Sequence, residues 1–257
     1  MILCEFDKCK TATFDPDVVT NVIPDFPKVA VACFAKKLFN ELLNSFEHEE
    51  IARIENENED TIVYKIDYKG TKFAFFMARV GAPALIADME SIIVMGAEKF
   101  VIFGCCGVLD SRINDLGIII PNAAMRDEGT SYHYMEATDE IKVNTNKEHL
   151  AAFKKILKKH NYTYTEGKTW TTDALFRETR DKVLRRKEAG CVCVDMECSA
   201  IFALMKFRGK ECFQFFYAAD NLDAQEWDSR SLVGGVKIPE KALIGLLAFE
   251  MGLEMNK

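Results

Sequence analysis

Apolar and polar positions follow two patterns along this chain: short runs that are apolar throughout, and longer stretches with apolar side chains on one helical face. Continuous apolar runs are typical of strands covered on both sides, whereas apolar spacing near the helical repeat is typical of amphipathic helices. Predicted strands occupy residues 29–34, 61–67, 71–78, 99–103, 116–121, 162–168 and the beginnings of the stretches 191–200 and 213–223. Predicted helices occupy residues 35–46, 84–95, 147–160, 179–187, 197–208 and 239–255.

Because strands alternate with helices, the sequence predicts an α/β fold, a single domain with a central, mixed and mostly parallel sheet flanked by helices. Residues 1–27 carry prolines and little periodicity, which predicts an N-terminal extension before a domain that spans 28–257. Segments without periodicity predict loops. These are an acidic, solvated segment at 48–60, a tight turn at 104–107, and polar loops at 124–134 and 170–178.

Composition narrows the functional classes. The net charge of −7 and the isoelectric point near 5.3 argue against nucleic acid, whose phosphates require basic surfaces, but leave room for a small anionic substrate in a local basic pocket. The chain shows neither a signal-peptide pattern nor an apolar run long enough to span a bilayer, so we expect a cytoplasmic protein without membrane contact. Nine cysteines without a CxxC pair indicate reduced thiols, and no residue spacing indicates a metal site.

Two carboxylates stand where predicted strands end, the place at which ligands collect in α/β sheets. Glu197 opens a helix after the run 191–195, and Asp220 follows the apolar run 213–219. Burial would raise the pKa of Asp220 toward that of a general acid for a purine N7, and Glu197 could accept hydrogen bonds from ribose hydroxyls. Structural roles compete: an Asx turn or cap for Asp220, and a first-turn helix carboxylate for Glu197. One carboxylate near a base and one near a sugar would suit cleavage of an N-glycosidic bond.

Other candidates carry weaker signals. Phe176 and Trp170 could stack on a base, with packing under a loop as the alternative. Met196 could contact a sugar face, although methionine is more often a core residue. His133 could carry a proton or be structural, and the glycines of segment 104–107 would let backbone N–H groups approach an anion.

Five segments resemble, in the same order, motifs of the nucleoside phosphorylase superfamily. This superfamily contains purine nucleoside phosphorylases, uridine phosphorylases and methylthioadenosine/S-adenosylhomocysteine nucleosidases. Val194–Ala200 is similar to its ribose-binding strand-to-helix motif, and Phe103–Gly107 is similar to its glycine loop. The other three segments are Val80–Pro83, Arg126–Ser131 and Thr172–Phe176. The resemblance covers most of the chain, from about Val29 to the last helix.

The resemblance implies a reversible reaction in which a nucleoside and inorganic phosphate give the free base and ribose 1-phosphate, with phosphate as co-substrate and no cofactor. The family's roles carry over to Met196 and Glu197 as ribose-binding residues and to Asp220 as the general acid. Its base-binding positions carry over to Cys106, Gly107, Leu175, Phe176 and Asp195. Uridine phosphorylases hold uracil with a Gln and an Arg after the base-pocket turn, and residues 177–180 contain no Gln. The resemblance therefore favours purines, while Arg177 keeps uridine open.

The phosphate site departs from the family's pattern. Residues 33–37 replace the family's N-terminal phosphate loop, and Ile102 stands where an arginine usually precedes the glycine loop. A buried dianion without a basic partner would cost several kcal/mol, so another cation must compensate if phosphate is the nucleophile. The expected phosphate-binding residues are Gly104, Cys105, Arg79 and Lys36, with Lys37 or Arg53 as substitutes.

Three alternatives stay open: a uridine phosphorylase, a nucleoside hydrolase that uses water, and a nucleoside-binding protein with impaired catalysis. The family's nucleosidases place a Glu in the loop after the first strand, and segment 33–37 contains no acidic residue, which counts against hydrolysis. The resemblance also implies a homo-oligomer, either a dimer or a trimer of dimers.

Overall fold

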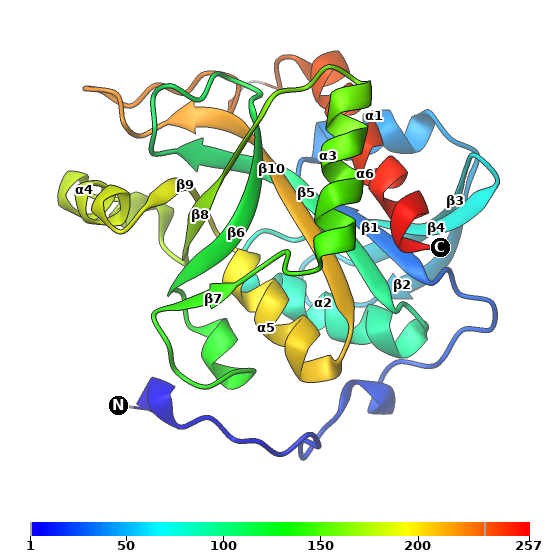
Figure 1. Cartoon of the computed structure of the whole chain (residues 1–257). Coiled ribbons are helices and arrows are strands. Elements are labelled where there is room, and N and C mark those ends of the chain that lie inside the picture. Colours follow the sequence, from blue (N-terminus) through cyan, green and yellow to red (C-terminus); the bar gives the residue numbers. More distant parts are fainter. Residues whose placement is uncertain (1, 234) are drawn as a thin grey trace.

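Ten strands form one mixed sheet in the computed structural model, which describes residues 2–233 and 235–257 (Figure 1). The strands are β1 (Val29–Cys33), β2 (His48–Ile54), β3 (Thr61–Tyr68), β4 (Thr71–Met77), β5 (Lys99–Val108), β6 (Ile118–Asp127), β7 (Glu140–Lys142), β8 (Tyr164–Thr172), β9 (Cys191–Asp195) and β10 (Glu211–Asn221). They follow the order β10-β6-β8-β9-β5-β1-β4-β3-β2, with β7 beside β6. The predicted α/β class is confirmed.

The sheet closes on itself at one end. β10 pairs in parallel with β5 and antiparallel with β6, so that β5, β10, β6, β8 and β9 form a ring, from which β1, β4, β3 and β2 extend. Periodicity predicts that strands exist but not which ones pair, so this closure could not be predicted from the sequence. The ring brings the carboxyl ends of β5, β9 and β10 close together.

Helices cover both faces of the sheet. They are α1 (Lys36–Asn44), α2 (Ala82–Met95), α3 (Lys147–Lys159), α4 (Arg180–Glu188), α5 (Cys198–Arg208) and α6 (Ile238–Met255), with short 3-10 helices at Ile2–Cys4, Pro16–Val18, Thr130–His133 and Leu175–Arg177. α1, α3 and α6 pack on one face, where Phe213 and Phe215 of β10 join their core. α2 and α5 pack on the other face, where Ala30 and Ala32 of β1 point. Alternate strand residues thus fill two cores, as expected for a sheet buried on both sides.

Two predicted loops are strands in the structure. Half of the acidic segment 48–60 is the edge strand β2, whose charged side chains remain exposed while its backbone pairs with β3. Charged residues are common on edge strands because they discourage pairing with other chains. The predicted tight turn at 104–107 is wrong, because these residues continue β5 and pair with β10 and β9.

The glycines of β5 serve close packing rather than a turn. A Cβ atom at Gly104 would lie 2.7 Å from the Phe34 ring, and one at Gly107 would lie 2.4 Å from Leu222 Cδ1. Both positions therefore need glycine because neighbouring side chains approach the strand backbone. β6 and β8 likewise extend into the predicted loops 124–134 and 170–178, ending at Asp127 and Thr172.

The described part of the N-terminal segment runs along the outside of the helical layer formed by α2 and α5 (Figure 1). Its attachment includes a hydrogen bond from Ile23 N to Met95 O and the buried side chain of Phe26. The domain boundary placed at residue 28 stays a prediction. None of the helices among residues 2–233 and 235–257 combines the length and apolar character that crossing a membrane requires.

Candidate active site

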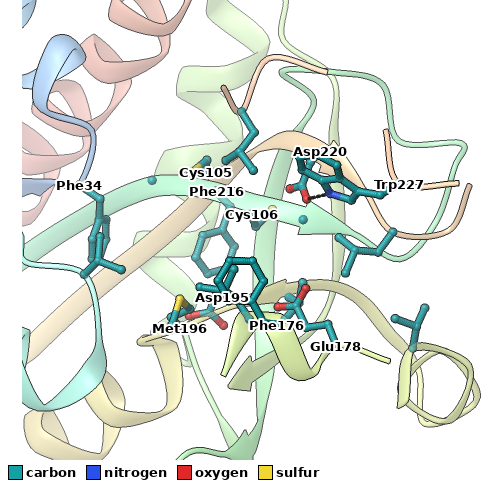
Figure 2. Close-up of a pocket in the computed structure, with 18 of the residues that line it drawn as sticks. Phe34, Cys105, Cys106, Phe176, Glu178, Asp195, Met196, Phe216, Asp220 and Trp227 are labelled. Atoms are coloured by element: carbon teal, nitrogen blue, oxygen red, sulfur yellow. Dashed lines mark hydrogen bonds between the residues drawn. The ribbon is translucent and has the colours of Figure 1, made fainter. Parts of the chain in front are cut away.

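A cavity of about 700 Å³ opens where β5, β9 and β10 end, between the loop that follows β8 and the segment that follows β10 (Figure 2). Ten of the predicted site residues line it, namely Gly104, Cys105, Cys106, Gly107, Leu175, Phe176, Asp195, Met196, Glu197 and Asp220. These residues come from four separate stretches of the chain. The two other predicted site residues, Arg79 and Lys36, do not line this cavity.

Glu197 stands at the junction of β9 and α5, with only 6% of its surface exposed. Its Oε1 accepts a hydrogen bond from the backbone N–H of Gly81 at 2.6 Å. Burial, followed by the nearby charge of Asp195, raises the pKa of Glu197 to about 8. This carboxyl group has room on the cavity side for further donors, which sugar hydroxyls could supply.

Asp195 organises this junction. Its Oδ1 accepts hydrogen bonds from the hydroxyls of Thr169 and Thr171, both at 2.9 Å. Its Oδ2 accepts from the backbone N–H groups of Glu197 at 2.8 Å and Cys198 at 2.6 Å, at the N-terminus of α5. Four donors from the protein already occupy the carboxylate. Asp195 therefore fixes the turn that presents Glu197, and the contact with a base that the resemblance implies for Asp195 stays a prediction.

Asp220 lies near the end of β10 and is 8% exposed. A register shift between Ala218 and Asp220 places it opposite Gly107, and such bulges often redirect side chains beside active sites. Its Oδ2 accepts a hydrogen bond from Trp227 Nε1 at 2.9 Å (Figure 2). Burial raises the pKa of Asp220, while the Trp227 donor and the Arg230 charge act in the opposite direction. Asp220 thus meets the requirement for a neutral-pH proton donor better than an exposed Asp would.

Aromatic side chains surround the space between these carboxyl groups. Figure 2 shows Phe176, Phe216 and Trp227 around the cavity, with Phe34 toward its other end. Phe176 is 92% exposed, so one ring face is available to a ligand. Trp170 is fully buried and donates from Nε1 to Asp127 at 3.0 Å, which excludes it as a stacking residue for this cavity.

The cavity residues that the sequence did not indicate include Glu178, Arg180 and Trp227. The carboxyl group of Glu178 has a pKa raised to about 7, first by burial and then by the charge of Asp220. Arg180 donates from Nη1 to the carbonyls of Leu222 and Ala224, which attaches the segment after β10 to α4. Trp227 covers Asp220. Glu178 stands two residues after Phe176, so its position next to the base-pocket turn was a usable signal, whereas nothing local indicated Trp227.

Arg79 has a structural partner. Its guanidinium donates to both oxygens of Asp88 at 2.8 and 2.7 Å and to Ala84 O at 3.0 Å, and Asp88 is fully buried. Lys36 is exposed, with its Nζ 3.5 Å from Glu59 Oε1. Nε and Nη2 of Arg79 are therefore held by a buried carboxylate and a backbone carbonyl, which does not favour the expected contact with phosphate, and that role of Arg79 stays a prediction. Arg53 likewise pairs with acidic neighbours around β2.

Replacing Arg79 with methionine is expected to lower the free energy of unfolding by on the order of 3 kcal/mol, because it leaves the Asp88 carboxylate buried and unpaired. Chemical denaturation would measure the change. Arg53→Met removes an exposed pair and serves as the control, with an expected loss of less than about 1 kcal/mol. Equal losses in the two variants would show that the pair between Arg79 and the buried Asp88 carboxylate contributes no more than an exposed one.

Comparisons with known proteins agree with this geometry. The family model described as the phosphorylase superfamily matches residues 28–235. A guanosine phosphorylase from Halorubrum lacusprofundi is 22% identical over 186 residues, 72% of this chain and 76% of that protein. In three curated relatives the aligned part spans 63%, 76% and 63% of their own lengths, so two of them are covered over less than two thirds.

Solved structures share the fold. A uridine phosphorylase from Vibrio fischeri superimposes with a TM-score of 0.74 at 21% identity, over 92% of this chain and 97% of that one. A purine nucleoside phosphorylase from Toxoplasma gondii, in complex with immucillin-H, gives 0.75 at 16% identity, over 91% and 94%. The matched family model spans the sheet, the cavity and the carboxyl groups that face it, and the chain belongs to the phosphorylase superfamily.

Proposed function

We propose that this protein is a nucleoside phosphorylase that cleaves purine nucleosides. Asp220 and Glu197 line one cavity, at the end of β10 and at the junction of β9 with α5, and this observation carries the proposal. The family match and the similarity to nucleoside phosphorylases support the reaction class. A cavity of about 700 Å³ is of the size that small-molecule sites commonly have.

In the proposed reaction, the bond between C1′ and the base nitrogen breaks, and its electron pair leaves with the base. Asp220 gives its proton to the purine N7, which neutralises the departing base. A phosphate oxygen forms the new bond to C1′, so the products are the free base and ribose 1-phosphate. Glu197 accepts hydrogen bonds from the ribose hydroxyls, and its negative charge stabilises the positive charge that develops on the sugar.

The preference for purines rests on the groups that would face the base. A carboxyl group with a raised pKa suits donation to a basic ring nitrogen such as N7, which uracil lacks. Glu178 provides a second carboxyl group on the same cavity and could accept N–H donors from the opposite edge of a purine. A guanosine phosphorylase among the relatives agrees with this preference, whereas the uridine phosphorylase fold neighbour keeps pyrimidines as the second candidate.

Turnover with inosine, guanosine, adenosine and uridine, each with and without phosphate, tests the proposal. We expect base release from at least one purine nucleoside that depends on phosphate and yields ribose 1-phosphate. Equal release in both buffers would replace phosphorolysis by hydrolysis. Release from uridine alone would reject the purine assignment. Stabilisation by nucleosides without turnover would indicate a binding protein.

A further inference from the structure

A second, smaller cavity of about 220 Å³ lies beside the candidate active site. Cys105 and Leu232 line both cavities, so the two spaces adjoin along these side chains. Three lysines also line the smaller one: Lys36 and Lys37 from the first turn of α1, and Lys241 from α6. No acidic residue lines it among the described residues.

Lys241 is the unusual member of this group. Only 5% of its surface is exposed, and its Nζ donates to the carbonyl of Ser231 at 2.6 Å. Within residues 2–233 and 235–257, no carboxylate forms an ion pair with it. The neighbouring Asp115 is occupied by Lys237 and by the Ser231 hydroxyl, each at 2.6 Å. A buried ammonium without a counter-charge costs several kcal/mol, and an anion in the cavity would compensate it.

The charges that line the larger cavity also favour the smaller cavity as the place for an anion. Its lining includes the carboxyl groups of Glu178, Asp195, Glu197 and Asp220. Arg180 is its one cationic lining residue among those described, and this guanidinium is hydrogen-bonded to backbone carbonyls. A dianion would be repelled from most of this space. The lysines behind Cys105 provide the nearest concentration of positive charge.

We infer that the lysine cavity holds inorganic phosphate, with Lys241 as its buried counter-charge and Lys36 and Lys37 as exposed ones. This inference rests on the proposed phosphorolysis. Phosphate bound next to Cys105 would lie along the wall that the two cavities share, from which an oxygen can approach C1′ of the nucleoside. Lys241 lies on the last helix, outside all five motif segments, so the resemblance in sequence gave it no role.

Kinetics with Lys241→Met tests this assignment. The expected result is a KM for phosphate raised at least about tenfold with a KM for the nucleoside unchanged within about twofold, because a charged hydrogen-bonding partner of the anion is lost. Lys241→Arg, which keeps the charge, should recover part of the loss. Lys155→Met, on the exposed side of α3, is the matched control and should leave both constants unchanged.

A binding measurement separates the inference from the proposed function. Inorganic phosphate alone should raise the Tm of the wild type and of Lys155→Met, and should raise that of Lys241→Met much less. If Lys241→Met does not fold, Lys37→Gln takes its place, with the same expected direction and a smaller effect. Phosphate-dependent turnover with an unchanged KM for phosphate in the lysine variants would overturn the lysine site while leaving phosphorolysis intact. Absence of phosphate-dependent turnover in the wild type would overturn phosphorolysis, whatever the binding measurement shows.

Discussion

Replacing Asp220 with asparagine is expected to lower kcat for inosine or guanosine by about 10²–10⁴-fold, the usual contribution of a general acid. Asparagine keeps the size of the side chain and can still accept the Trp227 hydrogen bond, but it has no proton to transfer. Because Glu197 is unaltered, the KM for the nucleoside should change far less than kcat. Steady-state kinetics at saturating phosphate measures both.

A substrate that needs no proton provides the sharpest control. In 7-methylguanosine the base already carries a positive charge, so it can leave without protonation at N7. Asp220→Asn should therefore retain most of its activity on this nucleoside. Asp223→Asn is the matched variant, because Asp223 stands three residues further along, pairs with Lys187 and does not line the cavity. Equal losses on both substrates would show that Asp220 is not the general acid.

The pH dependence should have the corresponding sign. Burial raises the pKa of Asp220, so a larger fraction of the carboxyl group is protonated at neutral pH than in an exposed aspartate. As the pH rises through that pKa, the proton donor is lost and kcat/KM for purine nucleosides should fall. The same titration should be weaker with 7-methylguanosine, because its cleavage does not use the proton.

The sequence was most informative where a strand ends in a chemically distinctive residue. Glu197 and Asp220 could be placed at strand ends because apolar runs precede them, and parallel strands bring such ends to one edge. The glycines at 104 and 107 were correctly placed at the cavity but for the wrong local reason, since a turn and a closely approached strand both favour glycine.

Residues that depend on tertiary pairing could not be predicted. Arg79 was expected to be available for an anion because the sequence does not show whether Asp88, in the helix that follows it, is buried or solvated. Only the packing of α2 against the sheet buries that carboxylate and commits the arginine to it. The sequence did not indicate that Lys241 is buried. Lysine in a helix is usually exposed, and the structure alone shows that this one faces a cavity.

Replacing Glu197 with glutamine is expected to reduce kcat/KM by on the order of 10²–10³-fold, because the charge that stabilises the cationic sugar is removed. The same change should not destabilise the protein. Glutamine can still accept the hydrogen bond from Gly81 N–H through its carbonyl oxygen. Kinetics and chemical denaturation on the same preparation would establish both results, with Glu188→Gln, exposed at the end of α4, as the control.

The free energy of unfolding should depend on pH because the Glu197 carboxyl group is buried. Burial raises the pKa of Glu197 from 4.5 to about 8, so between these values the folded protein holds a proton that the unfolded chain has released. The stability contributed by Glu197 therefore falls as the pH rises through this window. Glutamine does not titrate, so the unfolding free energy of Glu197→Gln should exceed that of the wild type increasingly between about pH 5 and about pH 8. A difference that stays constant over that range would mean that the Glu197 pKa is not raised.

Ribose binding should favour the ionised form of the Glu197 carboxyl group. In the structure the protein supplies Gly81 N–H as a donor to Glu197, and two ribose hydroxyls would add donors that favour the ionised carboxylate. Binding of a ribonucleoside should thus lower the pKa of Glu197 and release a proton near neutral pH. Calorimetry in buffers of different ionisation enthalpy would detect that release in the wild type. It should be smaller in Glu197→Gln, in which only Glu178 and Asp220 can still exchange protons when the nucleoside binds, and unchanged in Glu188→Gln, whose altered residue is exposed.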